Sequence, residues 1–288
     1  MRAARKSFKL SIYFFTILSV VMLIVFVGFL ITNSFSFFKT HSILEFLFSS
    51  EWDARDGNFG LFYILLANFF IAILACFISS FFAFGTTLFI CFYAKGVLKI
   101  VLNWMIEILA GIPSIIYGFF GLFTIVKLIE NGLSLSAGES VLAGSLILSI
   151  MILPFFTTHM IKSVNLAKDR FLKDSDSLGV SRGFFIRNII IKECFLATIT
   201  GFILAFSRAV GETMAVMMVI GNTPLFPHIL SKAQTIPSLI ALEMGMSEVG
   251  SSHYYALIAS GLVLFVFVAL LNLLIFILEN KTKKSENA

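Results

Sequence analysis

The chain has 288 residues, of which 59% are hydrophobic and only 13% are charged, and it carries a net charge of +5. Soluble globular domains contain about 25% charged residues, so this composition excludes an ordinary soluble domain. The basic residues stand in short runs between apolar stretches, which favours membrane topology over nucleic-acid binding as the origin of the positive balance. We therefore expect an all-α polytopic membrane protein that binds no nucleic acid.

Six apolar stretches reach the length of about 20 residues that a helix needs to cross a bilayer. We place these spans near residues 10–32, 61–92, 103–127, 139–161, 194–221 and 254–278. The first follows basic residues, as in a signal sequence, but it is too long and lacks a small-residue cleavage site. An uncleaved first helix is expected. The segment 33–58 is expected to be a short outer connector.

Arginine and lysine are distributed unevenly between the two sides of these spans. Most lie near the two termini and in the segments after the second and fourth spans, whereas the opposite side carries Lys39, Arg55, Lys127 and Lys232. Basic loops are retained in the cytoplasm, so both termini are predicted to be cytoplasmic.

The residues that would indicate a catalytic or metal site do not occur in the required patterns. The three cysteines have no metal-ligand or redox spacing, and we interpret them as packed thiols. No nucleophile–base pair or histidine cluster supports a membrane enzyme. The phosphate-binding pattern G-x-x-x-x-G-K-[ST] does not occur either, so ATP-driven transport would need an ATPase on another polypeptide.

Arg208 and Glu212 stand inside the fifth apolar stretch, in the segment 204–223. A charge at bilayer depth costs from about 3 to more than about 10 kcal/mol, so such residues usually have a function. Four residues apart, the two side chains are predicted to share a helical face and to touch. Arg208 lies about 14 residues, or about 21 Å, into the span, which places it beyond the bilayer middle.

These two residue types suit the binding of an oxyanion. A guanidinium presents a rigid, permanently charged fork that matches two oxygens of a phosphate group. Glu212 would neutralise Arg208 in the empty site, and would accept a hydrogen bond from the protonated oxygen of phosphate, which sulfate lacks. The alternatives are a structural ion pair, and a proton relay in an ion-coupled transporter that works alone.

Small residues recur at every fourth position in three rows, which predicts close helix packing in the membrane. The rows are Ala75, Ser79, Ala83 and Thr87; Ala110, Ser114 and Gly118; and Ser207, Gly211 and Ala215. Gly111 with Pro113, and also Pro154, interrupt helical hydrogen bonding within apolar spans. Such interruptions either line a pathway or are passive bends.

The longest basic segment, 162–193, is expected to form a short helix, a turn near Leu178 and Gly179, and a second short helix. Its second half carries the apolar residues Phe184, Phe185, Ile189 and Ile190. A loop that only obeys topology has little use for them, so we favour a docking element for a cytoplasmic partner.

Three segments resemble the permease subunits of ABC importers. The sequence Leu178-Gly-Val-Ser-Arg182, followed by an apolar helix, resembles the second half of their EAA loop. Residues 110–122 are similar to the third helix of phosphate-type permeases, and residues 207–222 to the fifth, in the PstC branch more than the PstA branch. The chain departs from the pattern at Lys173, Asp174 and Ser175, where Glu-Ala-Ala is usual, and at Lys192, where a proline is common.

The resemblance covers roughly residues 60–280 and implies a MetI-like permease core in a bacterial inner membrane. Residues 1–60 would form an added N-terminal helix with a periplasmic loop, 61–280 the permease domain with its coupling loop 162–193, and 281–288 a cytoplasmic tail. The implied partners are a second, PstA-like permease, two PstB-like ATPase subunits that bind ATP, and a periplasmic PstS-like phosphate-binding protein. No cofactor or metal is expected in this chain.

The residue patterns and the resemblance together predict roles for individual residues. Arg208 and Glu212 would bind the substrate during translocation. The ATPase would couple through Leu178, Gly179, Ser181 and Arg182. Helix packing would depend on Gly111, Pro113, Ser114, Gly118, Ser207 and Gly211. Phosphate is the expected substrate, and another oxyanion such as sulfate or molybdate is the alternative.

Overall fold

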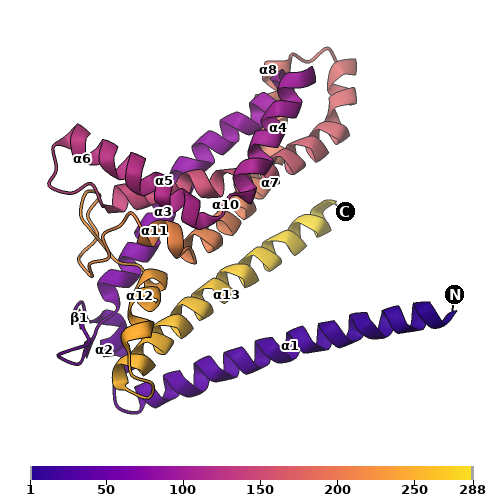
Figure 1. The fold of residues 1–288 in the computed structure, drawn as a ribbon. Coiled ribbons are helices and arrows are strands. Elements are labelled where there is room, and N and C mark those ends of the chain that lie inside the picture. The colour runs from indigo at the N-terminus through magenta and orange to yellow at the C-terminus, as the bar shows by residue number, and fades with distance from the viewer. Residues whose placement is uncertain (1, 287–288) are drawn as a thin grey trace.

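The computed structural model describes residues 2–286 as a bundle of helices with a single two-stranded hairpin (Figure 1). Five described helical segments are long and apolar enough to cross a membrane, namely Ser11–Phe38, Phe62–Tyr93, Ser114–Leu133, Val141–Ser177 and Ser252–Leu278. A pair of helices bent by 58°, Arg182–Glu193 and Phe195–Val210, supplies a sixth if it counts as one span. The prediction of an all-α polytopic fold is confirmed.

The two terminal helices, α1 (Arg2–Phe38) and α13 (Ser252–Glu286), pack against each other. Figure 1 shows the start of α1 and the end of α13 away from α2 and β1, while α8 lies apart from them at the top. Most described side chains of α1 are exposed apolar groups, as expected for a helix whose other neighbour is lipid. Both helices are longer than predicted, and α13 continues through most of the expected tail 281–288.

The segment 33–58 is more structured than the short connector that was expected, and it forms part of a cap at one end of the bundle. We call it the outer cap because the distribution of basic residues predicts that this end faces outward. It contains α2 (Ile43–Phe48) and the antiparallel strands β1 (Trp52–Asp53) and β2 (Asn58–Phe59). Their aromatic side chains share a buried cluster with α12 (Ile236–Glu243) and α13, and the 3₁₀ turn η4 (Met244–Met246) follows α12. Six apolar side chains exemplify this cluster: Phe37, Phe46, Trp52, Phe59, Leu239 and Leu257.

One carboxylate joins the three parts of this cap. An oxygen of Glu243 accepts the indole N–H of Trp52 at 3.0 Å and lies 2.8 Å from Nε2 of His253. The hairpin, α12 and α13 are therefore tied together at a partly buried point.

The centre of the bundle is α3 (Phe62–Leu88), extended by the π-helical turn η1 (Phe89–Tyr93), packed along α7 (Val141–Ser177). The small-residue row on α3 is buried at all four positions, Ala75, Ser79, Ala83 and Thr87. Small side chains let two helix backbones approach closely, which explains the long α3–α7 contact. Pro154 lies inside α7 without ending it.

The predicted span 103–127 is not one helix. It is divided into α4 (Gly96–Gly111) and α5 (Ser114–Phe120), and α5 continues through the π-helical η2 (Gly121–Val126) into α6 (Lys127–Leu133). Ile112 and Pro113, which lie between α4 and α5, have extended backbones with ψ of 128° and 140°. The break follows because proline cannot donate a backbone hydrogen bond and disfavours a helical residue before it.

The expected coupling loop 162–193 is more helical than predicted. Its first half is the continuation of α7 to Ser177, and its second half consists of α8 (Arg182–Phe184), the π-helical η3 (Phe185–Ile190) and α9 (Ile191–Glu193). The predicted turn at Leu178–Gly179 is present, and Gly179 has a φ of +66° that favours glycine. The chain then enters α10 (Phe195–Val210) and the single-turn helix α11 (Met214–Met217).

Candidate functional site

Arg208 lies in the last turn of α10, and its side chain is exposed. Its guanidinium carbon stands 4.1 Å from the ring centroid of Phe155 on α7, a cation–π contact. Phe155 is about 21 Å along α7 from Val141, the first residue of that helix, at about 1.5 Å per residue. The arginine is therefore held near the middle of the length of the membrane-crossing helices.

Arg208 faces a cavity of about 600 Å³ between α4, α7 and α10. This volume lies in the range of small-molecule binding sites. The polar residues that line it are Glu107, Thr158, His159, Lys162 and Arg208, and most of the remaining lining is apolar. Two basic side chains, Lys162 and Arg208, and the carboxyl group of Glu107 thus face a common space with few other polar groups.

The contact between α7 and α10 sets the shape of this cavity. Nε2 of His159 lies 3.1 Å from the carbonyl oxygen of Ala197 and 3.2 Å from Oγ1 of Thr200. A Cβ added at Gly201 would stand 2.6 Å from the ring of Phe156 and 2.8 Å from that of His159. Gly201 is required for this close approach, and His159, to which sequence reasoning assigned no role, fixes it.

Arg208 and Glu212 do not share a helical face, so that prediction is wrong. The helix α10 ends at Val210, Gly211 is its cap, and Glu212 lies in the non-helical link before α11. Oε1 of Glu212 accepts the backbone N–H of Ala215 at 3.4 Å, and in the described part of the chain no ion pair joins it to Arg208. Glycine followed two residues later by threonine is a helix stop and start signal, which the apolar context obscured. In the structure the carboxylate of Glu212, and not the hydroxyl of Thr213, accepts a hydrogen bond from the first turn of α11.

The two motif segments 110–122 and 207–222 meet in space, because α5 packs on α11. A Cβ on Gly118 would stand 3.2 Å from Cα of Ala215 and 2.6 Å from the sulfur of Met218. The other glycines singled out for packing behave differently. A Cβ on Gly111 would meet no atom within 4 Å, and a Cβ on Gly211 would meet only backbone oxygens of the preceding turn of α10. The predicted rows through Ala110 and through Ser207 fail because the backbone breaks at Ile112–Pro113 and at Gly211.

The remaining residues singled out for packing lie at or near these breaks. Pro113 precedes α5 and Ser114 is its first residue, while Ser207 is half-buried in the last turns of α10.

The turn after α7 presents some apolar side chains outward and packs others inward. Leu178 and Phe184 are 80% and 55% exposed, whereas Phe185 and Ile190 are buried in a cluster with residues of α7. Oγ of Ser181 accepts the N–H of Phe184 and so caps α8. The expected coupling residues thus lie in an ordered segment, Leu178–Phe184, which we call the projection after α7.

Sequence reasoning assigned Glu107, Phe155, Lys162 and Gly201 no part in the site. Glu107 is exposed at the end of α4 that leads to the cavity, and Lys162 lies on α7 two turns beyond Phe155. These groups come from three helices and meet only in the folded chain, so no local pattern in the sequence points to Phe155 as the neighbour of Arg208.

A family model described as the binding-protein-dependent transport system inner membrane component matches residues 83–284. The chain belongs to this family. It is therefore a permease subunit of an ABC importer and a multi-pass inner-membrane protein, which decides against a transporter that works alone. The matched range includes the cavity, the turn after α7 and both motif segments.

Named relatives agree with this membership. The chain is 35% identical over 245 residues to the probable ABC transporter permease protein YqgH of Bacillus subtilis, covering 84% of this chain and 79% of that protein. It is 32% identical over 244 residues to the phosphate transport system permease protein PstC of Xylella fastidiosa, covering 77% and 74%.

The fold is similar to that of a solved importer. A chain of the inward-facing MetNI methionine ABC transporter matches with a TM-score of 0.55 and 14% identity, covering 76% of this chain and 97% of that chain. At this identity the likeness concerns the fold alone, and it confirms the predicted MetI-like core.

Proposed function

We propose that this permease carries inorganic phosphate and that Arg208 is the cation that binds it. The observation that carries the proposal is the position of Arg208: an exposed guanidinium in a cavity of about 600 Å³, held over Phe155 and without a carboxylate partner among the described residues. A guanidinium this far along a membrane-crossing helix is costly, and an arriving oxyanion would offset that cost. The relatives named PstC support phosphate as the anion.

Two carboxylates are available to distinguish phosphate from sulfate. Glu107 lines the cavity itself, and Glu212 lies just after the C-cap of α10, the helix that carries Arg208. A carboxylate accepts a hydrogen bond from the proton that phosphate carries near neutral pH, while fully ionised sulfate offers none and is repelled. Because Arg208 is not neutralised by Glu212 in this structure, we assign these carboxylates selectivity rather than neutralisation of the empty site.

The proposal includes partner subunits. The cavity is walled by α4, α7 and α10, and Arg208 is exposed on its open side. An exposed cation on a membrane-facing surface needs a covering surface, and a second, PstA-like permease would supply it. PstB-like ATPase subunits would bind the projection at Leu178–Phe184, where apolar side chains are exposed, and hold the ATP. A PstS-like protein would deliver phosphate to the outer cap.

The test is uptake of ³²P-phosphate by proteoliposomes that contain this chain with its partner subunits and binding protein. We expect Arg208→Ala to reduce uptake to background. Arg208→Lys should retain a small fraction of the uptake, because lysine keeps the positive charge but cannot donate the two parallel hydrogen bonds of a guanidinium. Lys127→Ala is the matched control, since it removes a cation from α6 outside the cavity. Assembly is checked by co-purification of the subunits.

Selectivity is tested separately with Glu107→Gln and Glu212→Gln. We expect at least one of these variants to accept sulfate as a competitor for phosphate uptake. Full phosphate uptake by assembled Arg208→Ala would refute the binding role. Failure of the wild-type complex to transport phosphate, with transport of another oxyanion, would refute the substrate while leaving the site intact.

A further inference from the structure

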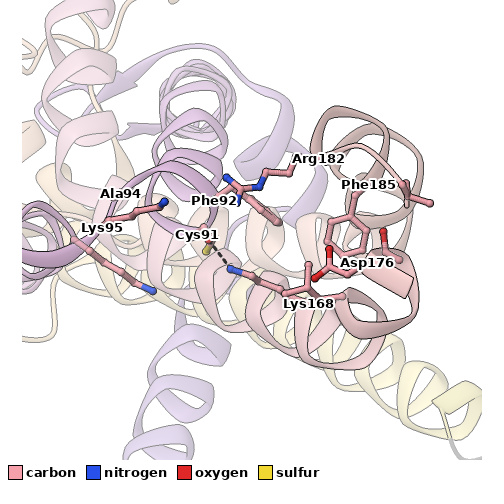
Figure 2. A pocket seen from close by; sticks show the side chains of 12 residues that line it. Cys91, Phe92, Ala94, Lys95, Lys168, Asp176, Arg182 and Phe185 are labelled. Atoms are coloured by element: carbon pink, nitrogen blue, oxygen red, sulfur yellow. Dashed lines mark hydrogen bonds between the residues drawn. The ribbon is translucent and has the colours of Figure 1, made fainter. Parts of the chain in front are cut away.

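A second polar cavity lies beside α7, and Lys168 in its lining is about 20 Å along that helix from Phe155, the neighbour of Arg208. Its volume is about 260 Å³, and Figure 2 shows the side chains that line it. It is bounded by the link between α3 and α4, the C-terminal third of α7 and the turn that leads into α8. None of its residues lines the cavity of Arg208.

Four basic side chains line this cavity, against one carboxylate, that of Asp176. The basic residues are Lys95, Lys99, Lys168 and Arg182. None of the four forms an ion pair within the described part of the chain. Four like charges with a single carboxylate among them repel one another, so this arrangement favours an additional anion between them.

The positive-inside distribution accounts for basic residues on this side of the membrane, but not for their convergence. The four come from three separate segments of the chain that folding brings to one cavity. In contrast, the nearby Arg170 is paired with Glu193 at 3.5 Å, and Lys173 and Arg187 are exposed outside the lining.

Lys168 is held in place before any ligand arrives. Its Nζ donates a hydrogen bond to the carbonyl oxygen of Cys91 at 2.9 Å and lies 5.1 Å from the ring centroid of Phe92. In Figure 2, Lys168 and Arg182 approach the segment Cys91–Phe92 from opposite sides. Phe185, which is buried, forms part of the wall. The site therefore has a fixed cation and an apolar wall, in addition to exposed lysines at its rim.

We propose that this cavity binds a phosphate group on the cytoplasmic side, distinct from the transported one. Three lysines and one arginine are typical ligands of a phosphate group, with arginine offering a bidentate fork. The volume lies below the usual range for drug-sized ligands, which selects a single ion or head group. The source is either free inorganic phosphate or the head group of an anionic lipid, since both present the same oxygens.

The position of the site gives the bound group a structural consequence. It bridges the α3–α4 link and the residues Val180 and Arg182 of the projection after α7, together with Phe185. A bound phosphate group would hold these two segments together, and its loss would leave them to repel each other.

The experiment uses the full chain with Arg208→Ala, so that the transport cavity contributes no phosphate binding. Lys99→Gln with Arg182→Gln removes two cations from the site, and Lys173→Gln with Arg187→Gln removes two neighbouring cations outside it. One arm measures ³²P-phosphate binding by equilibrium dialysis in nanodiscs of phosphatidylcholine. The other measures retention of phosphatidylglycerol by native mass spectrometry.

We expect the double substitution in the site to lower the affinity for one of these two ligands by at least about tenfold, which corresponds to the loss of at least one charge-assisted hydrogen bond. The control double substitution should change that affinity less than about twofold. Loss of ³²P-phosphate identifies the free ion, and loss of phosphatidylglycerol identifies the lipid. Equal behaviour of the site and control pairs in both arms, or no binding of either ligand by the parent chain, would overturn the proposal.

Discussion

Gly118 of α5 lies against Ala215 of α11 so closely that a Cβ at residue 118 would stand 3.2 Å from the Cα of Ala215. This contact joins the two segments that follow the breaks at Pro113 and Gly211. It therefore fixes the segment that follows one helix break against the segment that follows the other.

A larger residue at this contact should separate the two segments. We expect Gly118→Val to lower the free energy of unfolding by about 1–3 kcal/mol, because the backbone of α11 must move. The thermal midpoint of the purified chain in detergent measures this effect. Gly85→Val on α3 is the control, since a Cβ there meets nothing within 4 Å. An unchanged midpoint for Gly118→Val would show that α11 adjusts freely.

Removing the shared acceptor of the outer cap should loosen it. We expect Glu243→Ala to destabilise the cap by about 1–3 kcal/mol, because the indole of Trp52 and the imidazole of His253 lose their partner. Trp52 is one of two tryptophans, so in a Trp104→Phe background its fluorescence reports the cap alone. The emission should shift to longer wavelength. Glu248→Ala, at an exposed position, should leave it unchanged.

The ring beneath Arg208 should contribute to substrate affinity by orienting the guanidinium. We expect Phe155→Leu to raise the KM for phosphate uptake about two- to fivefold, the equivalent of a partly exposed cation–π contact of about 0.5–1 kcal/mol. Phe276→Leu on the exposed face of α13 provides the comparison. Identical KM values for the two variants would mean that Arg208 is positioned by other groups.

The backbone at Gly179 should be required for coupling to ATP hydrolysis. Its φ of +66° costs other residues about 1–2 kcal/mol, and asparagine less, so Gly179→Val should distort the turn more than Gly179→Asn. We expect the ratio of phosphate transported to ATP hydrolysed to fall in the order glycine, asparagine, valine, with normal insertion. Gly245→Val serves as control because its site is open and its φ is ordinary. Equal ratios would argue against this turn as the coupling element.

The sequence predicted unbroken helices well and broken ones poorly. The second span was expected at 61–92 and is observed at Phe62–Tyr93, because its apolar length and its small-residue row both point to one packed helix. The third and fifth spans have the same apolar composition on both sides of their breaks, so hydropathy could not divide them. The local signals at Pro113 and at Gly211–Thr213 were present but were outweighed by the apolar run.

The candidate site was predicted only in part for a related reason. Arg208 could be singled out because one cation in an apolar span is visible in the sequence. Glu107, Phe155 and Lys162 reach the same cavity from two other helices, and that convergence depends on how α4 and α10 lean on α7. Likewise, the expected contact between Arg208 and Glu212 assumed a continuous helix, which Gly211 ends.

The open side of the cavity at Arg208 has a consequence for how anion preference changes over time. If one chain supplies the cation and a neighbour supplies the facing surface, neither gene alone determines what passes. A substitution in the facing chain would alter selectivity while leaving every residue described in this chain in place, so shifts in substrate should be traced through both genes together.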